Sequence, residues 1–334
     1  MSSVVLDVKD LHTCYKTRLK EKVYAVEGVS LTLKEGEILG IAGESGCGKS
    51  TLALSLMGFY FQPLNFISGQ IFVKGVDIMT LTYEKLRREY LGKKIAYIPQ
   101  SAMNALNPTS KIINFIEDIL KSHGVGIGKN EMYEMVRERF ETLNLPKRAL
   151  NCYPNELSGG MKQRIVIAIS TILDPEILIA DEPTSALDVS CQKMVIKMLF
   201  GLMKDKLVKS IIFITHELPL LRHVADNIMV MYAGKIVERG PMKDVIFNPV
   251  HPYSKALMGA IIVPEEEMKD LKLSAIPGTP PNLKIRMDGC LFAERCNYVI
   301  PRCRSGEIAE LKWENQQYKC IFDCKTLMGY YKNE

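Results

Sequence analysis

The sequence predicts an α/β fold built around a parallel sheet, and three observations support this prediction. The apolar run Glu37–Ala42 leads into a glycine-rich turn and then into the helical pattern Ser50–Leu54. Apolar runs bounded by polar turns recur at Ile177–Ala180 and Ser210–Ile214, and the amphipathic segment Cys191–Met203 lies between them. Strands that alternate with helices are typical of a parallel sheet with helices packed on its faces.

Three other regions complete the predicted organisation. Residues 1–35 alternate apolar and polar side chains, which is typical of strands with one solvated face and predicts an antiparallel β layer. Residues 111–150 have apolar side chains at helical spacing, and after Gly240 the chain becomes rich in proline and loops. The predicted division is a core over residues 1–245, a helical subdomain within it at about 101–165, and a loop-rich C-terminal extension over 246–334.

Composition excludes several classes of protein. The chain has 334 residues, of which 47% are hydrophobic and 24% charged, so it can bury a core. Lys and Arg are interleaved with Asp and Glu at a net charge of +5, so we expect no nucleic-acid partner. Apolar runs such as Ile165–Leu173 are about half the length of a membrane span. The segment Met1–Asp10 lacks a signal-peptide pattern, so we expect a cytoplasmic location, where nine cysteines do not indicate a disulfide framework.

The strongest motif is Gly43–Ser50, which matches the phosphate-loop pattern G-x-x-x-x-G-K-S between a predicted strand and a predicted helix. Glycines let backbone N–H groups turn toward phosphates, and the helix N-terminus adds its positive end. A glycine-rich turn without a ligand is the alternative, and the flanking strand and helix disfavour it. The predicted nucleotide-binding set is Gly43, Glu44, Ser45, Gly46, Cys47, Gly48, Lys49, Ser50 and Thr51, with Ser50 also predicted to bind Mg²⁺.

Two carboxylates end the apolar strand Ile177–Ala180. In P-loop ATPases such a strand lies beside the phosphate loop, so we expect Asp181 to hold Mg²⁺ through water and Glu182 to polarise the attacking water. Two acidic residues at a strand end can also cap the following turn. The phosphate loop upstream favours the catalytic interpretation.

Four further motifs follow in an order that resembles the ABC ATPases. Leu157–Arg164, which contains Leu-Ser-Gly-Gly, is similar to the signature sequence of that family. Gln100 resembles the Q-loop glutamine, Ser185–Asp188 the D-loop, and His216 the switch histidine. The resemblance implies a P-loop ABC ATPase core with an antiparallel β subdomain and a helical subdomain.

The resemblance also implies roles for these residues. Glu182, His216 and Gln100 are the implied catalytic residues, and Gln100 is an implied Mg²⁺ ligand with Ser50 and Asp181. Each ATP is then sandwiched between two subunits, because the signature motif contacts the γ-phosphate bound by the partner. Tyr15 is the predicted adenine contact, and Tyr24 is the alternative. The remaining implied nucleotide contacts are Ser158, Gly159, Gly160 and Asp188.

A narrower resemblance comes from Ala105–Pro108, His251–Leu257 and Gly289–Cys296, which are similar to the ATPase subunits of dipeptide and oligopeptide importers. It implies an ATPase that powers peptide import from the cytoplasmic face of the membrane. The implied partners are a second ATPase subunit (a paralogue or a second copy), two transmembrane permease subunits and, indirectly, an extracytoplasmic binding protein. Nickel or oligosaccharide cargo, or a soluble ABC ATPase acting on a non-membrane partner, are the alternatives.

Five cysteines gather near the end of the chain. Cys290, Cys296, Cys303 and Cys320 are separated by five, six and sixteen residues, wider gaps than the tight pairs of structural zinc sites. Four thiolates can hold zinc or an iron–sulfur cluster, and free cysteines can simply be buried. The family motif implies a 4Fe-4S cluster on these four residues, with Cys324 as the alternative to Cys320.

Overall fold

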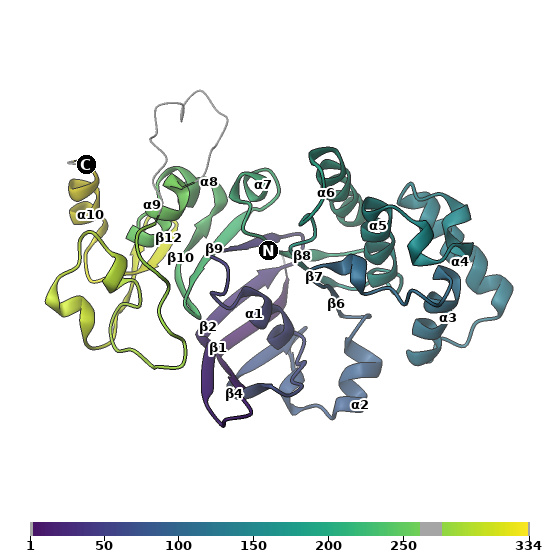
Figure 1. The fold of residues 1–334 in the computed structure, drawn as a ribbon, viewed down its shortest axis with the longest axis horizontal. Coiled ribbons are helices and arrows are strands. Elements are labelled where there is room, and N and C mark those ends of the chain that lie inside the picture. The colour runs from purple at the N-terminus through teal and green to yellow at the C-terminus, as the bar shows by residue number, and fades with distance from the viewer. Residues whose placement is uncertain (1–2, 261–275, 333–334) are drawn as a thin grey trace. The chain divides into compact units, whose positions relative to one another are not determined.

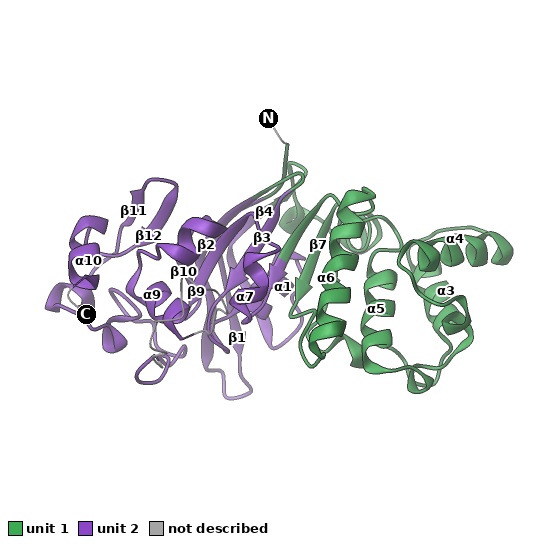
Figure 2. Ribbon diagram, turned by 90° about the horizontal axis from the view of Figure 1, so that it is seen from above, with its two compact units in different colours: residues 1–6, 33–36, 72–212 green, residues 7–32, 37–71, 213–334 purple. Residues whose placement is uncertain are grey.

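The computed structural model describes residues 3–260 and 276–332 of the chain (Figure 1). These residues form two compact units, which Figure 2 shows in different colours. Unit 1 comprises residues 1–6, 33–36 and 72–212, and unit 2 comprises residues 7–32, 37–71 and 213–334. The phosphate loop and the C-terminal extension therefore belong to the same unit. The boundary predicted between residues 245 and 246 divides the chain differently from these two units, and it stays a prediction.

The strands of unit 1 include a buried parallel pair, β6 and β7. Ile95 pairs with Ile177 and Ile98 with Ala180, and every residue of β7 is buried. A strand covered on both faces needs a continuous apolar run, which is the pattern that the sequence shows. The elements of unit 1 are β5 (Val76–Asp77), α2 (Tyr83–Lys85), β6 (Ile95–Ile98), α3 (Ile112–Ser122), α4 (Lys129–Thr142), α5 (Gly159–Ser170), β7 (Ile177–Asp181) and α6 (Val189–Lys204).

The helical region predicted over residues 111–150 is confirmed as α3 and α4, which lie near α5 in Figure 2. Helix α3 buries Ile112, Ile116 and Leu120, which are four residues apart and therefore share one face. This apolar stripe positions the helices that precede the signature motif.

In unit 2, the sheet follows the order β11-β12-β10-β9-β3. Strands β3 and β9 are parallel, whereas β10 pairs antiparallel with both β9 and β12. The C-terminal extension thus adds the hairpin β11–β12 to the sheet that carries the phosphate loop, which the prediction of a loop-rich extension did not include. The elements are β3 (Ile38–Ala42), α1 (Lys49–Leu56), α7 (Leu218–Arg222), β9 (Asn227–Tyr232), β10 (Lys235–Pro241), α8 (Met242–Phe247), α9 (Pro252–Gly259), β11 (Glu310–Trp313), β12 (Gln316–Lys319) and α10 (Cys324–Tyr331).

Four strands have residues in both units: β1 (Val4–Lys16), β2 (Lys22–Lys34), β4 (Leu64–Val73) and β8 (Ser210–Ile214). Strand β1 lies between β2 and β4, and β5 pairs antiparallel with the end of β4. In β2, Val29, Leu31 and Leu33 are buried while Ser30 and Thr32 are exposed. The predicted alternation is therefore confirmed for this part of β2.

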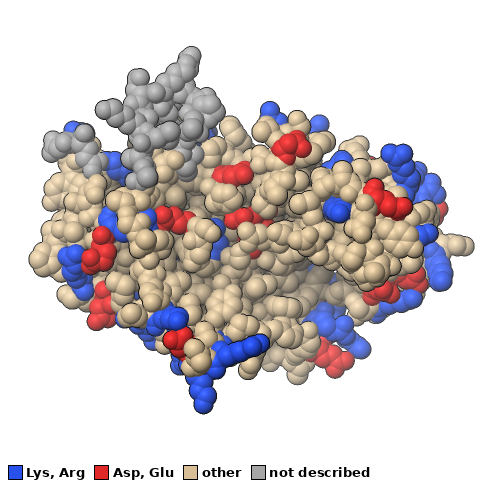
Figure 3. Space-filling view, viewed as in Figure 1, with Lys and Arg blue, Asp and Glu red and all other residues tan. Residues whose placement is uncertain are grey.

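The surface carries charges of both signs. On the face shown in Figure 3, Lys and Arg side chains are interspersed with Asp and Glu over the part that the structure describes. Within residues 3–260 and 276–332, no helix combines the length and the apolar character that a membrane crossing requires.

Candidate nucleotide site and cysteine-lined cavity

The phosphate loop of unit 2 joins the end of β3 to the start of α1, as predicted. Two of its glycines cannot be replaced without a clash. A Cβ on Gly43, where φ is 154°, would lie 2.1 Å from the carbonyl oxygen of Met231. A Cβ on Gly48, where φ is 108°, would lie 2.1 Å from the carbonyl oxygen of Ala25. The loop thus needs glycine for its backbone angles and for its close packing on neighbouring backbone.

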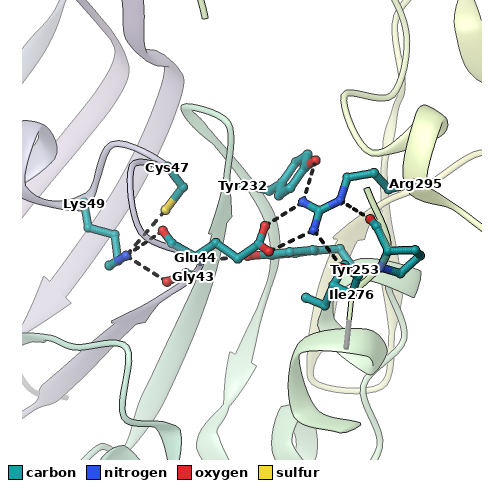
Figure 4. A network of polar contacts seen from close by, with 9 residues as sticks. Gly43, Glu44, Cys47, Lys49, Tyr232, Tyr253, Ile276 and Arg295 are labelled. Carbon is teal, nitrogen blue, oxygen red and sulfur yellow. Dashed lines mark hydrogen bonds and ion pairs between the residues drawn. The ribbon is translucent and has the colours of Figure 1, made fainter. Parts of the chain in front are cut away.

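Lys49 is held at this loop. Its side chain is buried, with 6% of the residue exposed, and its Nζ donates to the carbonyl oxygens of Gly43 (2.7 Å) and Glu44 (2.9 Å). Figure 4 shows the ammonium group between these carbonyls and the Cys47 sulfur. Burial raises the pKa of the Cys47 thiol, although Lys49 lowers it in part. The cation is therefore positioned by the loop itself.

The first turn of α1 contacts Tyr15. The hydroxyl groups of Tyr15 and Thr51 are 3.0 Å apart, so this half-buried tyrosine lies beside the phosphate loop. Tyr24 has a different environment, because the Arg286 guanidinium lies 4.3 Å from its ring centroid. The backbone N–H of Tyr24 donates to the carbonyl oxygen of Leu283 in the C-terminal extension.

In unit 1, the end of β7 presents the two predicted carboxylates. Asp181 is fully buried, and the Tyr97 hydroxyl of β6 donates to its Oδ2 at 3.1 Å. Glu182 follows with a left-handed backbone (φ 48°), and its Oε2 accepts from the Gln100 side-chain amide at 2.9 Å. Ser101, directly after Gln100, is also left-handed (φ 58°). Such strained non-glycine residues occur preferentially at functional sites.

The signature motif forms the N-terminus of α5. Ser158 is the N-cap, and its hydroxyl accepts from the backbone N–H of Met161 at 3.4 Å. Ser158 and Gly159 are exposed. A Cβ on Gly160 would lie 2.9 Å from the Cys191 sulfur, so a larger residue there would have to displace that side chain. A twelve-residue helix whose capped N-terminus faces solvent can receive an anion.

Asp188 has a local structural role in unit 1. It is the N-cap of α6, and its Oδ1 accepts from the backbone N–H of Cys191 at 2.9 Å. Hydrogen bonds from Cys191 lower the pKa of the Asp188 carboxyl. His216 is exposed and lies in unit 2, two residues after β8.

The structure groups the predicted residues within each unit. Unit 2 holds Tyr15, the phosphate-loop residues Gly43–Thr51, His216 and the five C-terminal cysteines; unit 1 holds Gln100, Ser158, Gly159, Gly160, Asp181, Glu182 and Asp188. Sequence reasoning missed Tyr97, which is bonded to Asp181, and also Arg295 and Tyr253, which both bond to Glu44. Tyr253 and Arg295 lie in segments singled out by their resemblance, His251–Leu257 and Gly289–Cys296, but nothing there indicated a contact with Glu44, and no local pattern marks Tyr97.

Four of the C-terminal cysteines line one small cavity: Cys290, Cys296, Cys303 and Cys320. Burial, together with the nearby Cys290, Cys320 and Cys303, raises the pKa of the Cys296 thiol to about 12. Burial likewise raises the pKa of Cys320 to about 11. Among the residues that the structure describes, no group of three or more His, Cys, Asp or Glu side chains is arranged to hold a metal ion.

Cys324 lies outside that cavity. It begins α10 and is buried in an apolar cluster with Val250, Tyr318 and Leu327, which Cys320 also joins. Burial, together with carboxylates such as Glu238, raises the pKa of the Cys324 thiol to about 11. Its position thus distinguishes it from the four cavity cysteines.

Comparisons with known proteins agree with this geometry. A family model described as ABC transporter matches residues 26–185, and one described as oligopeptide/dipeptide transporter, C-terminal region, matches residues 237–303. The dipeptide transport ATP-binding protein DppD of Caldanaerobacter subterraneus subsp. tengcongensis is 38% identical over 303 residues, which cover 90% of this chain and 91% of that protein. The oligopeptide transport ATP-binding protein OppD of Bacillus subtilis is 40% identical over 299 residues, which cover 89% and 82%.

Solved structures give the same result. A dimeric ATP-binding cassette in a post-hydrolysis state with bound ADP and Pi has a TM-score of 0.62 and 27% identity, covering 71% of this chain and 98% of that one. The protein cbiO1 of Clostridium perfringens, described as part of the ABC transporter complex cbiONQ, has a TM-score of 0.61 at 23% identity, covers 73% of this chain and 91% of that one, and supports the fold alone. The chain therefore belongs to the ABC transporter family of ATP-hydrolysing subunits, within the group that carries the oligopeptide/dipeptide transporter C-terminal region.

Proposed function

We propose that this chain hydrolyses ATP to power the import of dipeptides or oligopeptides across the cytoplasmic membrane. Relatives named as dipeptide and oligopeptide transport ATP-binding proteins support the cargo, because they align with about nine tenths of the chain. The chain would act as a peripheral subunit on the cytoplasmic face, bound to two transmembrane permease subunits. An extracytoplasmic binding protein would deliver the peptide to those subunits.

The phosphate loop would bind the nucleotide. Lys49 offers its charge to the β- and γ-phosphates, and α1 begins at the loop with its positive end. Tyr15 would contact the adenine, since it lies beside α1, whereas Arg286 covers the ring of Tyr24. The hydroxyl of Ser50, the carboxylate of Asp181 and the amide oxygen of Gln100 are oxygen donors of the kind that Mg²⁺ prefers. Bound Mg²⁺ would neutralise charge on the phosphates.

The contact between Gln100 and Glu182 carries the catalytic proposal. The Gln100 amide holds the Glu182 carboxylate at 2.9 Å at the end of β7, so the predicted base has a defined orientation. From there Glu182 would orient and polarise the attacking water, and His216 would contact the γ-phosphate. Gln100, with residues 101–110 after it, would report the state of the nucleotide to the membrane partner.

A second ATPase subunit, a paralogue or a second copy, would complete the site. The exposed N-terminus of α5, with Ser158, Gly159 and Gly160, is suited to the γ-phosphate held by the partner. Asp188 would lie near the shared nucleotide while it caps α6. Binding of ATP would then close the dimer, and loss of phosphate would open it.

We propose that four cysteines of the extension hold a 4Fe-4S cluster as a structural group. Cys290, Cys296, Cys303 and Cys320 line one cavity and come from separate turns and a strand end of the extension. Cysteines that bind different iron atoms stand farther apart than the ligands of one zinc ion, and four thiolates are the usual ligand set of such a cluster. When bound, it would supply folding energy to the extension.

The Glu182→Gln variant tests the proposed hydrolysis. Glutamine has the size of glutamate, and its carbonyl oxygen can still accept from Gln100, so the variant removes mainly the charge. We expect the affinity for ATP-Mg²⁺ to stay within about twofold and turnover to fall about 10²- to 10⁴-fold, which is about 3 to 5 kcal/mol in the activation barrier. Phosphate release and equilibrium ATP binding are the two measurements, and sedimentation with ATP reports pairing.

Glu134→Gln, at an exposed position on α4, is the matched control and should leave turnover unchanged. Turnover near wild type in Glu182→Gln would refute the role of Glu182. Copurification with two polytopic membrane proteins tests the assembly. Uptake measurements in cells that lack the chain test the cargo. A loss of peptide uptake is expected, whereas a loss of nickel or oligosaccharide uptake would show that the cargo is one of those instead.

A further inference from the structure

Arg295, in the cysteine-rich part of the extension, reaches the phosphate loop. Its guanidinium Nη1 and Nη2 donate to the two carboxylate oxygens of Glu44 at 2.7 and 2.9 Å, as Figure 4 shows. Only 4% of the Arg295 side chain is exposed. The two residues are 251 positions apart in the sequence. A bidentate pair between an arginine and a carboxylate is among the strongest polar contacts in proteins.

The rest of the guanidinium is held by the extension and the neighbouring sheet. Its Nε donates to the carbonyl oxygen of Pro277 at 2.7 Å, and Nη1 also donates to the Tyr232 hydroxyl at 3.2 Å. The rings of Tyr232 and Phe292 lie 5.7 and 5.8 Å from the guanidinium carbon. Because several groups orient the guanidinium, it offers Glu44 a fixed partner rather than a mobile one.

Glu44 is also the residue whose backbone connects the extension to Lys49. Its N–H donates to the hydroxyl of Tyr253, a residue of α9, at 2.9 Å. Its carbonyl oxygen accepts from the Lys49 ammonium at 2.9 Å. The side chain and the N–H of Glu44 are thus held by residues after position 250, while its carbonyl holds the lysine that faces the phosphates.

We propose that Arg295 is a positioning residue that orders the phosphate loop through Glu44, so that ATP affinity depends on the folded C-terminal extension. The proposal rests on the proposed binding of ATP at this loop. A loop rich in glycine loses much conformational freedom when it closes on phosphates, and ordering it beforehand lowers that cost. Without Arg295, the Glu44 carboxylate is left without its bidentate partner, and the carbonyl that orients Lys49 can move.

A purely structural role for Arg295 predicts a different result. In that case the variant Arg295→Met lowers the unfolding temperature, but the protein that stays folded binds ATP as the wild type does. A positioning role changes the affinity of the folded protein. The two readouts are therefore measured separately, as thermal unfolding without nucleotide and as ATP affinity well below the unfolding temperature.

The experiment compares Arg295→Met, Glu44→Gln and the double variant in the full chain. We expect each single variant to raise the Kd and the KM for ATP about tenfold, which corresponds to about 1.4 kcal/mol, with kcat within about twofold of wild type. The Kd of the double variant for ATP should be no higher than the higher Kd of the two single variants, because the two residues act as one unit. Arg295→Lys keeps the charge but not the bidentate geometry, so an intermediate Kd is expected.

Arg304→Met is the matched control. Arg304 pairs with both carboxylate oxygens of Glu294 at 3.0 and 3.3 Å and follows Cys303, but its side chain is 50% exposed. It should leave the Kd unchanged. A folded Arg295→Met with wild-type Kd, or additive losses in the double variant, would overturn the proposal. If Arg295→Met does not fold, the Kd values of Glu44→Gln and Arg295→Lys test the proposal in its place. A wild type that binds no ATP would refute the proposed function instead.

Discussion

Glu176, the residue before β7, joins three lysines of unit 1. Its Oε1 lies 2.6 Å from the ammonium of Lys94, and its Oε2 lies 2.9 Å from that of Lys74 and 3.3 Å from that of Lys209. Lys94 precedes β6, Lys74 follows β4 and Lys209 precedes β8, so one carboxylate connects the ends of several strands. The substitution Glu176→Gln keeps the volume and removes the shared charge.

The magnitude follows from the pKa of this carboxyl. Burial alone would raise the pKa of Glu176, but contacts with Lys94, Lys74 and Lys209 outweigh burial and lower it from 4.5 to about 2. At 1.36 kcal/mol per unit, that difference corresponds to about 3 kcal/mol of stability at pH 7. The lysines are partly exposed and screened by solvent, so we expect about 2 kcal/mol. Because the pKa is lowered in the folded protein, this contribution is complete above pH 4.5 and is lost as the pH falls toward 2.

Denaturant unfolding of wild type and Glu176→Gln at several pH values measures this effect. The free energy of unfolding should differ by about 2 kcal/mol at pH 7, and the difference should shrink between pH 4.5 and pH 2. Glu84→Gln, which removes an exposed pair with Arg88 at 3.4 Å, is the control and should change little. Equal stability of the two proteins at pH 7, or a difference that grows in acid, would refute the reasoning.

Two further predictions concern unit 2. Gly43→Ala should abolish ATP binding, because its Cβ would lie 2.1 Å from the carbonyl oxygen of Met231. A Cβ on Gly46 would have no atom within 4 Å, so Gly46→Ala should still bind ATP and should lose about 1 kcal/mol of stability because of its positive φ. Equal ATP binding by both variants would contradict this prediction. Protein purified without oxygen should be brown with about four irons per chain, and Cys320→Ser should lose that iron while Cys324→Ser keeps it. Colourless protein with one zinc per chain would refute the cluster and support the zinc alternative. Loss of iron in Cys324→Ser but not in Cys320→Ser would make Cys324 the fourth ligand.

The sequence alone predicted those parts of the site whose chemistry is local. A phosphate loop needs glycines, a lysine and a hydroxyl at set spacing between a strand and a helix, so Gly43–Ser50 could be identified without a structure, and β3 and α1 flank it as predicted. The same holds for β7, because a continuous apolar run followed by Asp181 and Glu182 encodes a buried strand with acids at its end. The resemblance to the family motif also identified the four cavity cysteines as one set.

Only the tertiary structure decided the contacts between distant segments. The resemblance singled out the segment that contains Arg295, but nothing in the sequence indicates its partner, since Glu44 lies 251 residues away. The hairpin β11–β12 was missed because each of its strands has only four residues, so the alternation of Leu311 and Trp313 with polar neighbours is too short to mark a strand. Pairing of β12 with β10 and of β11 with β12 joins the hairpin to the sheet. Cys320 and Cys324 are separated by three residues, yet only Cys320 lines the cavity. In each case the deciding quantity is which groups become neighbours once the chain is folded, and that depends on the packing of the whole unit rather than on adjacent residues.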